Sequence, residues 1–423
     1  MVRRRKISTL FSPRNLLAGL LALQLVGLVL WGIFWPRTGD HVRLALVVPE
    51  IEQTDWQPLI QKFEATHPKI TISLVSGPYT TEQREAIYTS DFQNSVAQYD
   101  LVYMDIIWVA QFADQLRELT PYIEQSQVDL TDFLPSEIRA GKFNQRLYRL
   151  PMRSDIGLTY YRKDWLKSGI PQNPAELKNQ LTQLQTNPAV NVGYLWPGRS
   201  SESLITNFIE VLSSFGGSWI DAENQVGLDQ PAAIQAAQQL RNLIAQDLSP
   251  EVTMNYTEEE SLKRFQQADA VMLRGWPYFW QALKTMQPQV AITHPLSLGN
   301  QPASGCRGGW GFAIPKNAAH PQAAWSAIEY FTSADVQRQF ALSSGFLPSR
   351  RSVFADPQVI QQYPFYAELR QRLETRSVFR PAIPQYRQAS VILQQALGQV
   401  LQGEATAAVA LSEAAQATRA LLN

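Results

Sequence analysis

The stretch Val42-Arg-Leu-Ala-Leu-Val-Val48 is the first of three short apolar runs that decide the fold. The second run is Ile70–Val75, and the third is Tyr99-Asp-Leu-Val-Tyr-Met-Asp105, with acidic residues near both ends. Short runs rich in β-branched and aromatic residues are typical of buried strands. The sequence therefore predicts three strands within the first hundred residues.

Helical patterns separate these three runs. Apolar side chains recur at helical spacing over Trp56–Thr66, and a second helix is predicted from Thr80 to near Gln98. A strand–helix–strand alternation predicts an α/β fold in which helices cover both faces of a parallel sheet. Such sheets bind ligands at the carboxyl ends of their strands, so Glu50 and Asp105 are the first candidate binding residues.

The alternation of strands and helices continues through the rest of the chain. Further strands are predicted at Arg146–Met152, Leu158–Arg162 and Ala270–Leu273, and further helices at Ser203–Phe215, Ala232–Ala245 and Glu258–Gln267. Pro295–Gly311 is rich in Gly, Pro and Ser and is predicted to cross between parts of the molecule. From Gln385 a long helical pattern follows, which we expect Gly398 and Gly403 to interrupt.

Composition and charge narrow the range of possible folds and functions. A chain of 423 residues is long enough for two or three domains or for one large two-lobed unit. It holds 37 Lys plus Arg and 37 Asp plus Glu, and this balance argues against a nucleic-acid-binding protein. Five of those bases lie within residues 1–35, which contain no acid, so the remainder has 32 bases against 37 acids, a net charge of −5.

An uncharged run from Asn15 to Trp35 follows the basic cluster Arg3–Lys6. About 20 apolar residues span roughly 30 Å as a helix, the thickness of the hydrocarbon core of a bilayer. The basic cluster predicts a cytoplasmic N-terminus and an exported main domain. We favour an uncleaved transmembrane anchor over residues 16–35, because no small-residue cleavage site follows Trp35; a cleaved signal peptide and twin-arginine export are the alternatives.

The motifs of several enzyme classes are absent from the sequence. It contains no phosphate-binding Gly-x4-Gly-Lys-Ser/Thr loop, no dinucleotide fingerprint and no Gly-x-Ser-x-Gly nucleophile elbow. The four histidines are scattered and three precede proline, which favours turn or surface positions over metal ligation. The single cysteine, Cys306, rules out an intrachain disulfide and has no activating neighbour in the sequence. We therefore expect neither a cofactor nor a metal.

Aromatic residues cluster beside polar residues in predicted loops. Four tryptophans have this setting, and they are Trp108, Trp196, Trp276 and Trp310. A sugar ring packs its apolar face on an indole, and its hydroxyl groups need charged or amide partners. Gly309 before Trp310 also permits close approach of the backbone to a ligand. For each tryptophan alone, packing in the core remains the alternative.

Six segments together resemble the extracellular solute-binding proteins of ABC sugar importers, family 1, especially the trehalose/maltose-binding branch. The matching segments are Tyr103–Phe112, Asp155–Asp164, Arg264–Met272, Gly275–Tyr278, Gly308–Lys316 and Arg380–Tyr386. The resemblance covers nearly all of residues 42–420. It implies a two-lobed periplasmic-binding-protein clamshell of type II, similar to maltose-binding protein, with the N-terminal transmembrane helix placed before it.

The resemblance also implies where the lobes and the ligand site lie. After residues 1–39, one lobe would comprise residues 40–154 plus 310–345, and the other 155–309 plus 346–423. Carried over residue by residue, the ligand-binding positions are Glu50 or Glu52, Arg84, Asp105, Asp155, Trp276, Gly309, Trp310 and Arg380. This chain has Arg153 where the family branch carries tyrosine, and its first acidic loop is longer than expected, so both glutamates stay candidates.

Each charged candidate also has a purely structural interpretation. Asp105 is positioned to cap a following helix, Asp155 to form a turn, Arg84 to lie on a solvated helix face, and Arg380 to hold the tail by a salt bridge. These alternatives stay open at the level of sequence.

The sequence thus predicts a non-catalytic receptor, anchored at the plasma membrane, with its main domain periplasmic or extracellular. We expect a monomer that binds a small α-linked disaccharide or a glucosyl solute, in the class of trehalose, maltose, sucrose and glucosylglycerol. It would deliver this ligand to an ABC permease whose ATPase is a separate chain. The alternative is a membrane-anchored glycoside hydrolase that uses paired carboxylates, with Asp105 and Asp155 as candidates.

Overall fold

The computed structural model describes residues 41–78 and 80–422. The predicted anchor over residues 16–35 lies outside the described residues. Among the described residues, no helix is long and apolar enough to span a bilayer.

The first strand–helix–strand unit forms as the sequence predicts. Strand β1 (Val42–Pro49) pairs in parallel with β2 (Ile70–Gly77), and helix α2 (Gln53–Thr66) connects them. The buried face of α2 carries Trp56 and Phe63, which belong to the helical pattern that predicted this helix. Helix α3 (Thr81–Asp91) ends seven residues before the predicted Gln98, because the Asp91 carboxylate accepts backbone hydrogen bonds from Gln98 and Tyr99 and closes a turn.

The third predicted strand does not extend a parallel sheet, and this prediction was wrong. Strand β3 (Val102–Asp105) pairs antiparallel with β11 (Gly305–Ala313), a segment 200 residues later, so that Asp105 faces Trp310. The resulting sheet has the order β12-β6-β11-β13, with β3 also on β11. Its other strands are β6 (Leu150–Ile156), β12 (Leu347–Pro348) and β13 (Ser377–Val378).

A second sheet follows in the middle of the chain. Its order is β10-β7-β9-β8, and its strands are β7 (Leu158–Arg162), β8 (Val192–Leu195), β9 (Ala270–Gly275) and β10 (Val290–Thr293). β8 and β9 are parallel, whereas β7 is antiparallel to both of its neighbours. Helix α10 (Glu258–Phe265) packs on β9, the Glu210–Arg274 ion pair joins α8 (Glu202–Ser214) to β9, and α9 (Pro231–Ala245) packs on α8.

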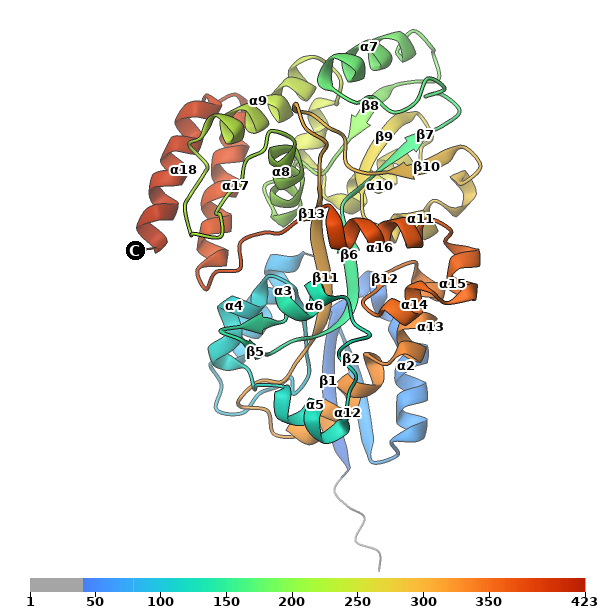
Figure 1. Cartoon of the computed structure of the whole chain (residues 1–423), viewed down its shortest axis with the longest axis vertical. Coiled ribbons are helices and arrows are strands. Elements are labelled where there is room, and N and C mark those ends of the chain that lie inside the picture. Colours follow the sequence, from blue (N-terminus) through green and yellow to red (C-terminus); the bar gives the residue numbers. More distant parts are fainter. Residues whose placement is uncertain (1–40, 79, 423) are drawn as a thin grey trace, which may run out of the picture.

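The molecule has two lobes (Figure 1). We call the half around β1, β2 and β3 the β1 lobe, and the half around β7, β8, β9 and β10 the β7 lobe. The long strands β6 and β11 lie between them and pair antiparallel along the centre of the molecule. The C-terminal helices α17 (Tyr386–Gln402) and α18 (Ala407–Leu422) pack beside α8 and α9 in the β7 lobe. Gly398 lies inside α17, contrary to the prediction, and Gly403 ends this helix with a φ of +78°.

The remaining elements are short. The helices are α4 (Trp108–Phe112), α5 (Thr120–Ser126), α6 (Pro135–Ala140), α7 (Pro174–Leu184), α11 (Phe279–Ala282), α12 (Pro321–Phe331), α13 (Ala334–Ser344), α14 (Arg351–Phe354), α15 (Pro357–Gln362) and α16 (Tyr366–Thr375). Strands β4 (Lys142–Phe143) and β5 (Arg146–Leu147) form a hairpin, so the predicted strand Arg146–Met152 is divided between β5 and β6.

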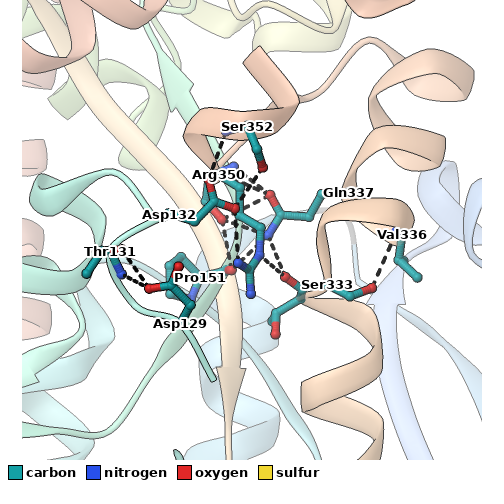
Figure 2. A network of polar contacts seen from close by, with 11 residues as sticks. Asp129, Thr131, Asp132, Pro151, Ser333, Val336, Gln337, Arg350 and Ser352 are labelled. Carbon is teal, nitrogen blue, oxygen red and sulfur yellow. Dashed lines mark hydrogen bonds and ion pairs between the residues drawn. The ribbon is translucent and has the colours of Figure 1, made fainter. Parts of the chain in front are cut away.

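A polar network fixes the segment that leads into α14 (Figure 2). The Arg350 guanidinium donates to the Asp132 carboxylate at 3.1 Å, and Asp132 also accepts from the Ser352 backbone and hydroxyl. The buried Gln337 amide donates to the Ser349 hydroxyl, which in turn donates to the Pro151 carbonyl of β6. Chain segments around residues 132, 151 and 350 are thereby held together at one end of the central sheet.

Candidate functional site

A cavity of about 360 Å³, within the size range of small-molecule sites, is lined by residues from both the β1 lobe and the β7 lobe. Eight of the nine sequence-predicted residues line it: Glu52, Arg84, Asp105, Asp155, Trp276, Gly309, Trp310 and Arg380. Glu50 does not line the cavity and is exposed to solvent. Of the two glutamates left open by the sequence, the structure thus brings Glu52 to this site.

Two tryptophans form apolar parts of the wall. Trp276 follows directly after β9, and its ring nitrogen donates to Glu258 at 3.2 Å. The Arg274 guanidinium lies 4.1 Å from the centre of the Trp276 ring, so one face of the indole is backed by a cation. Trp310 has the same kind of neighbour, because the Arg84 guanidinium is 4.5 Å from its ring. Trp310 lies inside β11 and not in the predicted loop.

The other two tryptophans belong to the core and do not line the cavity. Trp108 lies in α4 and is buried. Trp196 follows β8, is fully buried and donates to the Ser249 hydroxyl. For these two, the alternative of packing in the core is therefore correct, and polar neighbours in the sequence did not distinguish them from Trp276 and Trp310.

Arg380 connects two carboxylates that come from different lobes. Its guanidinium donates to Asp105 at the end of β3 and to Glu202 at the start of α8, both at 3.0 Å. Glu202 also accepts from the Tyr386 and Ser390 hydroxyls. These groups are almost fully buried, and although burial lowers the pKa of Arg380, the two carboxylates raise it above its usual value. Arg380 thus forms the salt bridges of its structural interpretation, and it also lines the cavity.

A second connection between the lobes lies beside the first. The Glu82 carboxylate, in α3, accepts from the backbone N–H of Glu202 at 2.6 Å. Burial and the neighbouring charge of Glu202 raise the pKa of Glu82. The Asp105 carboxylate also accepts from the Ile107 N–H, but Asp105 does not cap a helix, because the N-cap of α4 is Ile107 and no side chain caps it.

Arg153 occupies a central position that the sequence did not assign to it. Its guanidinium donates to Glu52 at 2.9 Å, to Asp155 at 2.5 Å and to the Tyr103 hydroxyl at 3.0 Å, and it lies 3.8 Å from the Phe346 ring. The sequence singled out Arg153 only as a departure from the family's tyrosine. The structure shows that its charge balances two buried carboxylates in the cavity wall.

Asp155 lies in strand β6 rather than in a turn. Burial raises its pKa to about 7; Arg153 opposes this rise, and the charges of Glu52, Glu137 and Asp105 add to it. One carboxylate oxygen bonds Arg153, while the other is buried without a hydrogen-bond partner. A buried acceptor of this kind favours a ligand that supplies a donor.

The backbone conformation at position 309 requires glycine. Its φ of +147° is a conformation that side chains strongly disfavour, and a Cβ atom there would lie 2.9 Å from the Arg153 carbonyl. The sequence suggested glycine for the approach of a ligand, and the structure supplies this additional reason.

Several acidic residues of the wall were missed by sequence reasoning. Glu258 and Glu259 open α10, where Thr257 and Glu260 form a capping box that fixes the first turn. Burial raises the pKa of Glu259 to about 7. The available signal was Thr257-Glu-Glu-Glu260, an N-terminal helix signature that places two further carboxylates next to a strand end.

Cys306 is fully buried, and burial raises the pKa of its thiol to about 12, so it is an inert core residue. Within residues 41–78 and 80–422, no group of three or more His, Cys, Asp or Glu side chains is arranged to hold a metal ion.

Two lobes joined by long central strands, with a polar and aromatic cavity between them, define a binding protein of the clamshell type. A family model described as bacterial extracellular solute-binding protein matches residues 49–338, and the chain belongs to this family. The glycoside hydrolase alternative finds no support, because the matching family model describes a solute-binding protein.

Individual relatives agree with this assignment. A probable ABC transporter-binding protein of Deinococcus radiodurans is 27% identical over 349 residues, 78% of this chain and 82% of the relative. The structure of maltose-bound MalE3 of T. maritima is 28% identical and has a TM-score of 0.85, covering 90% of this chain and 100% of that one. A ribitol-bound solute-binding protein of Agrobacterium radiobacter K84, at 22% identity, 90% and 99% coverage and a TM-score of 0.80, shares the fold.

Proposed function

We propose that this protein is the substrate-binding component of an ABC sugar importer. It takes up a small α-linked disaccharide or a glucosyl solute, such as trehalose, maltose, sucrose or glucosylglycerol, in the cavity between the lobes. The observation that carries the proposal is the pairing of Trp276 and Trp310 with buried carboxylates and arginines in one cavity of suitable size. An indole offers a surface for a sugar ring, and ionised groups offer strong hydrogen bonds to its hydroxyls.

Both lobes contribute side chains to this site. We assign residues 40–154 plus 310–345 to one lobe and 155–309 plus 346–423 to the other. On this division Asp105, Arg84 and Trp310 belong to the first lobe, and Trp276, Asp155 and Arg380 to the second. The bond from Arg380 to Asp105 then closes across the cavity. Sugar that contacts both sides binds the closed form better and shifts the population toward it.

The relatives support delivery to a permease. The Deinococcus radiodurans relative carries an ABC transporter name, and the T. maritima structure holds maltose, whereas the Agrobacterium structure holds a polyol. We propose that the closed protein, a monomer held at the membrane by residues 16–35, docks on permease subunits outside the plasma membrane. The family's extracellular character agrees with this location.

Calorimetric titration of the full-length protein with trehalose, maltose, sucrose, glucosylglycerol and glucose tests the proposal. We expect one saccharide to bind with a dissociation constant near or below the micromolar range, about −8 kcal/mol. Trp276→Ala should weaken that binding at least tenfold, whereas Trp280→Ala is a matched control, because Trp280 lies four residues away and does not line the cavity. Absence of binding by every saccharide, or equal binding by the Trp276 variant, would overturn the proposal.

A further inference from the structure

Three carboxylates gather around two aromatic side chains on the β7-lobe side of the cavity. Glu258 accepts from the Trp276 ring nitrogen at 3.2 Å, and Glu259 accepts from the Tyr278 hydroxyl at 3.1 Å. Asp155 lies next to Trp276, because a Cβ added at Gly308, between them, would be 3.2 Å from Asp155 and 3.4 Å from the indole. We call Asp155, Glu258, Glu259, Trp276 and Tyr278 the acidic subsite; all five line the cavity.

All three carboxylates act on the Tyr278 hydroxyl. Burial raises the pKa of Tyr278, and the charges of Glu259, Glu258 and Asp155 raise it further. Arg153 is the base that opposes them there. The acidic subsite therefore concentrates negative charge around an aromatic surface.

The bases near this subsite are already engaged. Arg153 donates to Asp155 and to Glu52, and it leaves the second Asp155 oxygen buried without a partner. Arg274 lies behind Trp276, where it pairs with the buried Glu210 and does not line the cavity. Around the cavity as a whole, eight carboxyl side chains face three arginines, so the wall has a formal charge of −5.

We propose that the ligand is an aminated saccharide, whose protonated nitrogen lies in the acidic subsite against Trp276 and Tyr278 and bonds the free Asp155 oxygen. This inference rests on the proposed function and adds a positive charge to the sugar. An ammonium group donates to carboxylates and is attracted to the faces of aromatic rings, which are the two chemistries that this subsite offers.

The protonation of the subsite agrees with a cationic occupant. Burial raises the pKa values of both Asp155 and Glu259 to about 7, which means that the protein's own groups do not fully compensate their ionised forms. The groups facing Asp155 are Arg153, Glu52, Glu137 and Asp105, and those facing Glu259 are Tyr278 and Glu260. An ammonium group supplies the missing positive charge, whereas a neutral hydroxyl does not.

Matched ligands give the test. Trehalose and maltose are titrated calorimetrically into the full-length protein beside their analogues in which a single hydroxyl, at C2 or C6, is replaced by an amine. We expect at least one amine analogue to bind at least tenfold tighter than its parent, as a charge-assisted hydrogen bond provides. If the neutral parents bind as tightly as every amine analogue, the inference is wrong while the proposed function stands. If no saccharide of either kind binds, the proposed function fails.

Proton exchange gives a readout that needs no mutation. Near pH 7 an ammonium group lowers the pKa of Asp155 and Glu259, so binding releases up to roughly half a proton from each. Titrations in two buffers of different ionisation enthalpy measure this release. Uptake of protons with the amine analogue would contradict the inference, because it indicates burial without a compensating charge.

Variants of neighbouring glutamates complete the test. Glu259→Gln should abolish the preference for amine over hydroxyl, whereas Glu260→Gln should keep it, because glutamine still completes the capping box. A preference that survives Glu259→Gln would place the nitrogen elsewhere. Calcium chloride alone is titrated as well, and tight calcium binding that competes with the amine analogues would make the acidic subsite a metal site and overturn the inference.

Discussion

Replacement of Asp155 by asparagine should make the protein more stable at alkaline pH while it weakens binding. The carboxyl group has a pKa near 3.9 in an unfolded chain and about 7 in the folded protein, because it is buried. A pKa raised on folding means that the native state binds more protons than the unfolded state, so stability falls as pH rises from about 4 to 7. A shift of about three pKa units corresponds to roughly 4 kcal/mol, so at pH 8 the free energy of unfolding of the wild type is lower by about this amount than near pH 4.

The Asp155→Asn variant lacks this titration. The amide of the new side chain still offers an oxygen to Arg153, as the protonated carboxyl does, and it carries no charge to desolvate. We therefore expect the variant to exceed the wild type by a few kcal/mol, about 4 at most, at pH 8, and the gap to shrink toward zero near pH 4. Urea unfolding of the ligand-free proteins at pH 4.5, 6 and 8, with unchanged slopes, measures the gap.

The outcome that refutes this reasoning is a gap that does not depend on pH. A variant less stable than the wild type at pH 8 would also refute it, because it would show that the ionised carboxylate gains more from Arg153 than burial costs. Ligand titrations on the same samples give the second half of the prediction. Affinity should fall at least tenfold, since the unpartnered oxygen of Asp155 is replaced by an amide.

Three further substitutions test other parts of the structure. Asp269→Asn should lower stability by about 0.5 kcal/mol at neutral pH and by less near pH 3, because the hydrogen bonds and ion pair with Arg264 hold the pKa of Asp269 below its usual value and this stabilisation is lost as pH falls through that lowered pKa; urea unfolding at both pH values checks this. Gly309→Ala should lower the unfolding free energy by about 1–3 kcal/mol at every pH, measured in the same way, because its φ is +147°. Arg380→Met should destabilise by about 3–5 kcal/mol, since it leaves two buried carboxylates without their cation, whereas the thermal midpoint of Arg419→Met should stay close to that of the wild type because the ion pair of Arg419 with Asp229 is partly open to solvent. An equal effect of the two arginine substitutions would show that Arg380 is not buried as described.

The local elements were predictable because their signals are local. The parallel pair β1 and β2 and the helix between them follow from apolar periodicity within 36 residues. The partner of β3 was not predictable in this way, since β11 lies 200 residues later and only the folded chain brings Trp310 opposite Asp105. Periodicity identifies a strand but does not select its neighbour.

The site was partly predictable for a related reason. Motifs carried over from the family marked eight residues that line the cavity, and Trp276 among them also stood out by its polar neighbours. The sequence marked Arg153 only as a departure from the family's tyrosine. Its role as the counter-charge of Glu52 and Asp155 depends on the burial of these two carboxylates beside it. Glu259 gave no signal beyond helix capping, and its place in the wall arises from the packing of α10 against β9.

The central claim is that the cavity between the lobes binds the saccharide. A crystal structure of the protein with the saccharide that binds most tightly in calorimetry tests it directly. We predict a sugar ring against Trp276 or Trp310, with hydroxyls bonded to Asp105 and Arg380. A saccharide found instead at another surface, such as the hollow beside Gly216 and Gly217, with the cavity between the lobes empty, would contradict the account.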